Sequence, residues 1–238
     1  MDLDLKIKGF LLLLAGLIFL YILIAYVILP FLWRRYERSH SLVGLPKTAI
    51  TKEGIPGDPL NIGLIGSEKE VIQAMIKANW ISSDPVTLKT SVRIVESALL
   101  HREYSNAPIS DLYLWGRRQD LAFEMPVGDS PKQRHHVRFW RAPVNVHDRV
   151  FWIGSVTFDE SCGVSHLTGK ITHHIASDVD KERDKLMSDL TKAGQIIECY
   201  QGRGVDPTLY GKNGGGDRYF TDGKITIGIV SPNNEVQN

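Results

Sequence analysis

The chain has 238 residues, of which 43% are apolar, and a formal net charge of +1. That length fits one membrane anchor and one globular domain, and the near-zero charge gives no general attraction for nucleic acid. The two cysteines, Cys162 and Cys199, have no CxxC spacing, which argues against a zinc ribbon or a dithiol redox motif. We expect buried free thiols, with a disulfide only where the domain faces an oxidising compartment.

Residues 9–33 read GFLLLLAGLIFLYILIAYVILPFLW and carry no charge. At about 1.5 Å per helical residue, this run crosses a bilayer core of about 30 Å. It is longer than the apolar part of a cleaved signal peptide and lacks a small-residue cleavage site. The aromatic residues at its end suit the membrane interface, and Arg34 and Arg35 suit the headgroups. We predict a single-pass signal anchor at residues 9–33, preceded by a tail of residues 1–8.

Basic residues flank this span unequally. Lys6 and Lys8 precede it, and a larger set follows it, namely Arg34, Arg35, Arg38, Lys47 and Lys52. The positive-inside rule therefore favours a cytoplasmic location for the C-terminal part. Residues 34–57 are predicted to be a linker, because they end in the Gly- and Pro-containing stretch TKEGIPG.

A globular domain is predicted over residues 58–232, followed by a tail at 233–238. It begins with a short buried strand at residues 60–66. Ser67 and Glu70 then form a capping box that opens a helix extending to Trp80. A second helix is predicted over residues 87–101, where apolar residues recur on one face.

From Ser110 the pattern changes to alternation typical of strands. Helical spacing returns once, at residues 177–193, and a glycine-rich stretch at residues 211–217 is predicted to be a mobile loop. The expected strands are residues 112–115, 121–125, 135–141, 150–158, 170–175, 195–200 and 224–230. This order predicts an α+β fold with a mostly antiparallel sheet flanked by helices.

The stretch RHHVRFWR, residues 134–141, concentrates charge and aromatic character. As a strand, it places His136, Arg138 and Trp140 on one face and the residues between them on the other. Because Val137 and Phe139 belong to the second set, that set is expected to face the core. The His-Arg-Trp ladder then remains as a candidate site.

Three hypotheses compete for this ladder. In the first, arginines grip a phosphate or carboxylate, and a histidine beside them acts as acid or base. Arginines, a tryptophan, histidines and carboxylates near the ladder supply such a site. The candidate ligand-binding residues are Arg117, Arg118, Arg138 and Trp140. The candidate acids or bases are His136, His174 and His166, with Asp120 or Glu124 orienting them.

The second hypothesis is a metal site, since histidines at alternate strand positions can bind zinc. However, the histidine pairs at 135–136 and 173–174 are adjacent, so their side chains point to opposite faces of a strand, and no HExxH or HxH motif is present. The third hypothesis is structural: arginines and carboxylates stabilise an antiparallel sheet by cross-strand pairing. The candidate site therefore contains no metal ligand, and the sequence leaves any cofactor unknown.

Sequence motifs of known chemistry are scarce. No Walker motif and no GxSxG elbow is present. His166 and Thr168 form one copy of the HxT pattern of two-histidine phosphoesterases, which need two copies. The motifs therefore do not settle whether the protein is an enzyme.

Four longer stretches carry a resemblance: DPLNIGLIGS, LYLWGRRQDLAFEMPVG, HHVRFWR and HLTGKITHHIASDVDKERD. From Gly57 to Gly194 the chain resembles the LssY C-terminal domain family of bacterial membrane proteins. Relatives occur behind a single transmembrane helix, or fused after DedA-type or type-2 phosphatidic-acid-phosphatase membrane domains. The resemblance implies a bacterial inner-membrane location and a connection to phospholipid or polyprenyl-phosphate metabolism, without naming a catalytic residue.

The resulting expectation is a membrane-anchored domain that binds an anionic, phosphate-bearing and lipid-linked ligand near the bilayer surface, and not nucleic acid. Two alternatives stay open. One is a non-enzymatic interaction module for another membrane protein, and the other is a metal-dependent hydrolase.

Overall fold

The computed structural model describes residues 2–29, 31–32, 45–83, 111–128, 133–146, 148–164, 171–205 and 207–232. It divides into two compact units, Met1–Val43 and Gly44–Asn238, which are described separately. The helix predicted over residues 87–101 and the side chain of His166 lie outside the described residues.

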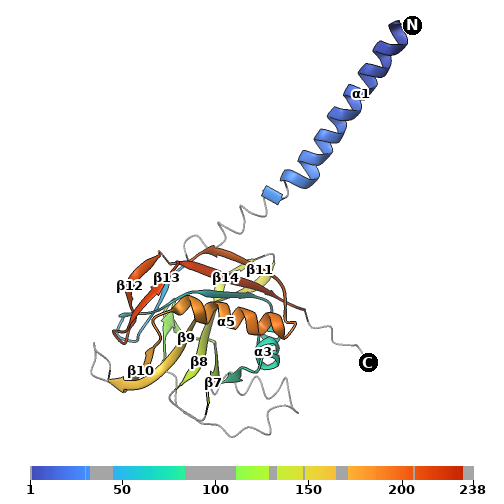
Figure 1. The fold of residues 1–238 in the computed structure, drawn as a ribbon. Helices are drawn as coiled ribbons and strands as arrows, with labels where there is room; N and C mark the ends of the chain where they lie inside the picture. Colours follow the sequence, from blue (N-terminus) through green and yellow to red (C-terminus); the bar gives the residue numbers. More distant parts are fainter. Residues whose placement is uncertain are drawn as a thin grey trace, which may run out of the picture. The chain divides into compact units, whose positions relative to one another are not determined.

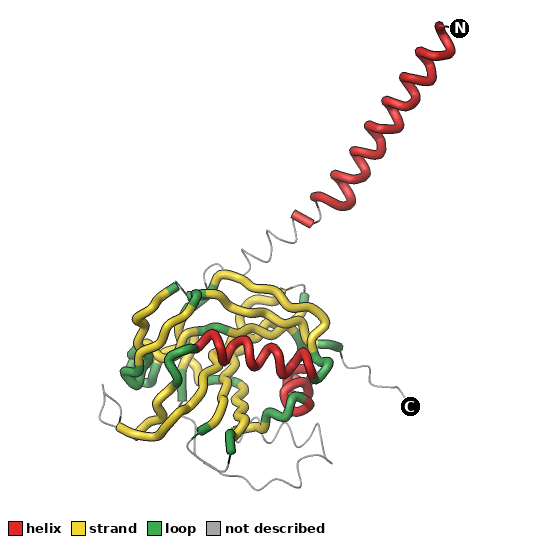
Figure 2. Tube along the Cα trace, viewed as in Figure 1, coloured by secondary structure: helices red, strands yellow, loops and turns green. Residues whose placement is uncertain are grey.

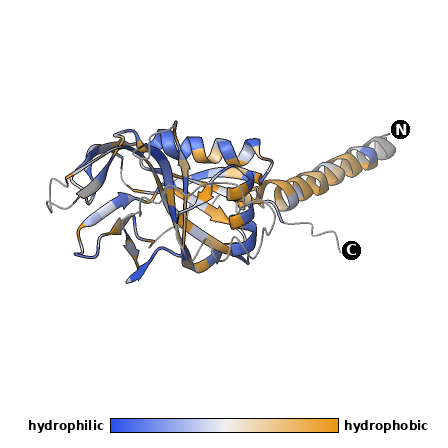
Figure 3. Ribbon diagram, turned by 90° about the horizontal axis from the view of Figure 1, so that it is seen from below, coloured by the Kyte–Doolittle hydropathy of each residue, from blue (hydrophilic) through white to orange (hydrophobic). Residues whose placement is uncertain are grey.

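The first unit is a long apolar helix. Helix α1 (Asp2–Leu23) continues into a π-helical segment, η1 (Ile24–Ile28). Residues Ile7–Ile28 are long and apolar enough to cross a membrane. Hydrophobic residues make up most of this helix (Figure 3), and Leu12, Phe19 and Tyr26 are among the side chains left exposed. Such a surface is unfavourable in water, so this helix is the candidate membrane span that the sequence predicts.

An eight-stranded sheet forms the centre of the second unit, with the path β11-β14-β3-β9-β8-β7-β4 and with β10 paired to β9 (Figure 1). Among its described pairs, β14 and β3 are parallel and the others are antiparallel, which confirms the predicted α+β class. The strands are β3 (Ile62–Ile65), β4 (Ile81–Ser82), β7 (Leu121–Pro126), β8 (Arg134–Val146), β9 (Arg149–Val164), β10 (Ile171–Ile175), β11 (Ile196–Arg203) and β14 (Lys224–Val230).

Strands β8 and β9 are much longer than predicted and form the backbone of the site. Their pairing runs from Arg134 opposite Asp159 to Val146 opposite Arg149, with an irregularity after Arg141. Gly154 allows the two strands to lie this close, since a Cβ there would stand 2.6 Å from the Phe139 ring and 2.7 Å from the Arg138 carbonyl oxygen. The polar and apolar faces of the two strands are therefore held in fixed register.

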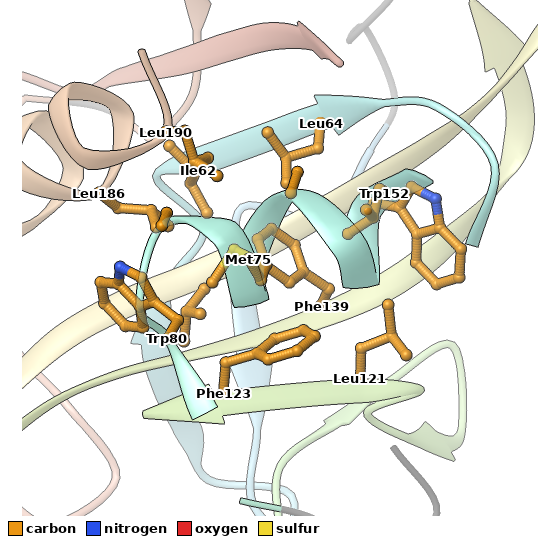
Figure 4. Close-up of a cluster of buried hydrophobic side chains, with 14 of the residues drawn as sticks. Ile62, Leu64, Met75, Trp80, Leu121, Phe123, Phe139, Trp152, Leu186 and Leu190 are labelled. Atoms are coloured by element: carbon orange, nitrogen blue, oxygen red, sulfur yellow. The ribbon is translucent and has the colours of Figure 1, made fainter. Parts of the chain in front are cut away.

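Two helices cover one face of this sheet (Figure 2): α3 (Glu68–Lys77) and α5 (Val179–Lys192). The predicted capping box is present, because Ser67 accepts from the Glu70 amide and Glu70 accepts from the Ser67 amide. The apolar sides of both helices pack on the sheet in one core (Figure 4). Its buried members include Ile62, Leu64, Met75, Trp80, Leu121, Phe123, Val137, Phe139, Trp152, Leu186 and Leu190.

Two smaller sheets were not predicted. One has the order β2-β1-β5-β6 and comprises β1 (Thr48–Ile50), β2 (Pro56–Pro59), β5 (Tyr113–Leu114) and β6 (Arg117–Arg118). The other is the antiparallel pair β12 (Thr208–Lys212) and β13 (Arg218–Thr221). Strand β1 and the start of β2 therefore lie within the stretch read as linker.

Two local predictions were wrong. The strand expected over residues 112–115 ends at Leu114, because Trp115 (φ 51°) and Gly116 (φ 74°) turn the chain back into β6. Cys199 is a free thiol, as expected, but it is exposed rather than buried. The reason is its position on β11, the last strand of the described sheet, whose side chains are mostly exposed.

Candidate functional site

A buried polar cluster occupies the face of the central sheet that the helices do not cover. On β8 and β9, the residues opposite one another on this face are Arg138 and Ser155, His136 and Thr157, and Arg134 and Asp159. Residues paired across antiparallel strands point to the same face, so these side chains form one layer. The buried polar cluster consists of Glu124, Arg134, His136, Arg138, Trp140, Ser155, Thr157 and Asp159, with Asp58 and Asn213 joining it from other elements; all are buried.

Arg134 is the most fully paired cation of the cluster. Its Nη1 donates to Glu124 Oε2 at 2.9 Å and its Nε to Asp159 Oδ2 at 3.0 Å. Burial raises the pKa of Glu124, and Arg134 opposes that rise. Burial acts in the same direction on Asp159, but His136, His173 and Arg134 beside it hold its pKa well below the usual value. The two carboxyls that share one arginine are therefore driven apart in pKa.

His136 lies between the two arginines. Its Nε2 lies 2.7 Å from Arg138 Nη1 and 2.9 Å from Thr157 Oγ1, and its Nδ1 lies 3.1 Å from Asp159 Oδ1. A guanidinium has only donors, so the contact of Arg138 with His136 requires that Nε2 carries no proton. The proton of the neutral ring is therefore on Nδ1. The contact between Nδ1 and Asp159 Oδ1 has the distance of an ion pair but not the geometry of a hydrogen bond, since neither atom has a hydrogen-bond partner among the described residues. Nε2 already accepts from Arg138, which limits its use as a base in this state.

Arg138 connects the cluster to a loop of the β12–β13 hairpin. Its Nη1 lies 3.3 Å from Asp58 Oδ2, and Asp58 Oδ1 accepts from Asn213 Nδ2 at 3.2 Å. Burial lowers the pKa of Arg138, while Asp58 and Asp159 raise it. The same loop carries Asp217, which lies 2.6 Å from His174 Nδ1. The loop expected to be mobile is therefore connected to the cluster through Asn213, and hydrogen bonds from Gly215 and Asp217 to the Asn213 side chain close it.

The cluster also contains buried groups without a hydrogen-bond partner. Within the part of the chain that the structure describes, Trp140 Nε1 and Ser155 Oγ have none, although both residues are almost completely buried. A buried donor left unpaired costs about 1–3 kcal/mol, so such groups are uncommon unless water or a ligand satisfies them. Both lie on the face that carries Arg138, since Ser155 is directly opposite it and Trp140 follows two residues later on β8.

The predicted site residues are only partly brought together. His136, Arg138 and Trp140 lie on one face, as the alternation predicts; Glu124 lies opposite His136 on β7, and all four are buried. Glu124 pairs with Arg134 and does not orient a histidine. His174 pairs with Asp217 at the far end of the hairpin loop.

The two arginines of β6 have partners of their own. Arg117 pairs with Asp120, and its second nitrogen donates to the backbone oxygen of Arg141. Arg118 lies 3.2 Å from Asp111. Asp120 also accepts from the Arg141 amide at 2.6 Å, so it fixes the β6–β7 connection to β8 and contacts no described histidine.

Sequence reasoning missed the residues that complete the cluster: Asp58, Ser155, Thr157, Asp159 and Asn213. The three from β9 had a signal, because Ser155, Thr157 and Asp159 alternate with the apolar residues Val156 and Phe158. Asp58 and Asn213 had none, since their contact spans 155 positions. For the metal hypothesis, the described residues contain no group of three His, Cys, Asp or Glu side chains arranged to hold an ion.

Together, the fold and the site define an α+β domain with a buried charged face, preceded by a candidate membrane span. The sequence profile described as LssY C-terminus matches residues 42–225, so the chain belongs to the LssY C-terminal family that its motifs resemble. No curated protein and no solved structure matches the chain.

Proposed function

We propose that the domain binds an anionic, phosphate-bearing ligand of the membrane surface at the buried polar cluster. The observation that carries this proposal is the pair of unpartnered groups, Trp140 Nε1 and Ser155 Oγ, on the face of Arg138. An indole N–H can only donate, so it needs an acceptor, and phosphate oxygens are acceptors. A cation and two such groups on one buried face are the elements of an oxyanion site.

Asp58 marks the position that such an anion would take. Its 3.3 Å contact with Arg138 is long for a charge-assisted hydrogen bond, which is usually about 2.7–2.9 Å. A carboxylate in a weak contact can exchange for a phosphate that binds the guanidinium more closely. Arg134 is less available, because two carboxylates already hold it.

Charged groups of both signs lie close together in the cluster. Two arginines face the carboxyls of Asp58, Glu124 and Asp159; burial raises the pKa of Glu124, and Arg134 opposes that rise. The candidate span fixes the chain to the membrane, which raises the local concentration of a lipid-borne ligand. Family membership adds the context of bacterial membrane proteins without an assigned reaction. The bilayer in question is then the bacterial inner membrane, with the domain on its cytoplasmic side.

The direct test is binding by the full chain in nanodiscs, measured by calorimetry. Inorganic phosphate and glycerol phosphate test the shared chemistry, and discs with or without phosphatidic acid test the lipid source. We expect Arg138→Gln to weaken binding at least tenfold and Trp140→Phe to weaken it about fivefold, since one hydrogen bond contributes about 1 kcal/mol. Arg203→Gln, on the exposed strand β11, is the matched control. Equal affinity in all four proteins, or no binding by any, would refute the proposal.

A second candidate is an interaction module for another membrane protein. Strand β11 favours it, because it ends the described sheet path and most of its side chains are exposed, with Ile197 63% exposed. An exposed edge strand can pair with a strand of a partner. Replacing Cys199 on this strand by a photocrosslinking residue would capture such a partner in intact membranes. A crosslink that Ile197→Pro abolishes would support this candidate.

A further inference from the structure

Strands β12 and β13 pair as a hairpin (Figure 1), and exposed and buried residues alternate along β13. On β13, Tyr219 and Thr221 are buried, and Tyr219 packs with Ile175 and Val179. Arg218 and Phe220 alternate with them and are exposed. On β12, Lys212 lies directly opposite Arg218, and Tyr210 lies two residues before it. The exposed set Tyr210, Lys212, Arg218 and Phe220 is called here the basic-aromatic face, and Leu209 adjoins it.

Like charges stand opposite one another on this face. Lys212 and Arg218 are both exposed cross-strand neighbours, an arrangement that destabilises an isolated hairpin. Neither forms an ion pair with any residue in the described ranges. The nearest carboxylate in sequence, Asp217, is directed to His174 instead. This pair of cations therefore lacks a compensating anion within the described protein.

Large apolar groups surround these cations. Leu209 is 74% exposed, Tyr210 is 81% exposed and Phe220 is 39% exposed. Aromatic side chains beside lysine and arginine are typical of surfaces that contact the headgroup region of a bilayer. Each basic residue near an anionic bilayer contributes about 1 kcal/mol.

We infer that the basic-aromatic face docks on an anionic phospholipid bilayer. The chain itself argues for this occupant, because its candidate span ends at Ile28 and the domain unit begins at Gly44. A tether this short keeps a lipid surface permanently within reach of the domain. The inference rests on the span and the hairpin, not on ligand binding at the cluster.

Docking has a consequence for the buried polar cluster. The two cations directly flank the loop that carries Asn213 and Asp217. Asn213 donates to Asp58, and Asp58 contacts Arg138. These three side chains connect the hairpin to the buried polar cluster. A bilayer bound by Lys212 and Arg218 thereby lies next to the loop that closes the cluster.

The test uses the full chain in nanodiscs, with Cys162→Ser and Cys199→Ser as background. An environment-sensitive NBD label is placed at Leu209→Cys on the hairpin or at Lys192→Cys, an exposed site at the end of α5. In discs with about one-third anionic lipid, the label at 209 is expected to shift to the blue and to be quenched by spin-labelled lipids. The label at 192 is expected to show neither effect.

The Lys212→Ala, Arg218→Ala double variant is expected to lose most of the quenching at 209, as are discs of uncharged lipid and buffers of high salt. Quenching at 209 no greater than at 192 would overturn the inference. Quenching that is the same in uncharged lipid and in the double variant would overturn its electrostatic basis. A blue shift without lipid quenching would show that a protein surface covers the face instead. Phosphate binding by the double variant is measured in parallel. Loss of membrane quenching with retained phosphate binding separates the docking inference from the proposed binding at the cluster.

Discussion

Two regions of the domain bury an arginine among carboxylates, and they differ in how completely the polar groups are paired. Around Arg183 of α5, the guanidinium donates to Asp184 at 2.8 Å, to Asp222 at 2.7 Å and to Asp180 at 3.2 Å. Asp180 in turn accepts from the Thr221 hydroxyl and the Asp222 amide. In the buried polar cluster, Trp140 Nε1 and Ser155 Oγ lack such partners among the described residues.

We propose that this difference separates a structural role at Arg183 from a binding role at the buried polar cluster. Burial opposes the charge of Arg183, but its carboxylates prevail and raise its pKa, whereas burial lowers the pKa of Arg138. All three nitrogens of the Arg183 guanidinium donate hydrogen bonds, which fix α5 to the β13–β14 segment. An incompletely paired layer costs stability, so its unpaired groups need a further partner, which is the ligand in the proposed function.

The largest expected effect is on the polar cluster itself. Asp159→Asn leaves Arg134 and His136 beside a neutral group and should cost about 3–5 kcal/mol of unfolding free energy at pH 7. Because the folded-state pKa of Asp159 is lowered, its contribution is present above the unfolded value of about 4 and is lost as pH falls below it. The unfolding free energy, measured with urea between pH 7 and pH 3, should therefore depend less on pH in the variant than in the parent. The same dependence of unfolding free energy on pH in both proteins would contradict the lowered pKa of Asp159.

The Arg183 region gives the next largest effect. Arg183→Gln should lower the unfolding free energy by about 3 kcal/mol, because three carboxylates lose their cation. The comparison predicts unchanged affinity for phosphate in the folded variant. Lys181→Gln, exposed on the same helix, should change neither quantity. A loss of affinity with Arg183→Gln would remove the distinction between the two regions.

Glu124→Gln should have a smaller effect, about 1 kcal/mol, and an opposite dependence on pH. The folded-state pKa of Glu124 is raised, so its stabilising contribution is present at low pH and is lost as pH rises through that value. Compared with the parent, the variant should thus gain relative stability towards pH 7. Thermal unfolding at pH 4 and pH 7 measures this change, and a relative loss at pH 7 would show that the charged pair with Arg134 dominates.

The sequence predicts the parts of this molecule that depend on local pattern. The candidate span, the capping box of α3 and the opposite faces of β8 follow from periodicity and are present in the structure. Asp58 and Asn213 could not be predicted, because their approach depends on how the small sheet and the hairpin pack. Arg117 and Arg118 were assigned to the site on charge alone, although nearby carboxylates engage them. The β12–β13 hairpin was missed because glycines and exposed side chains obscure its alternation.

The most direct measurement is the Ser155→Ala variant, compared with the parent for unfolding free energy and for phosphate affinity. Removing a buried hydroxyl that lacks a partner should leave stability unchanged or raise it by up to about 1 kcal/mol, while affinity falls about fivefold. Lower stability with unchanged affinity would contradict the account, because the Ser155 hydroxyl would then be part of the fold and not of a ligand site.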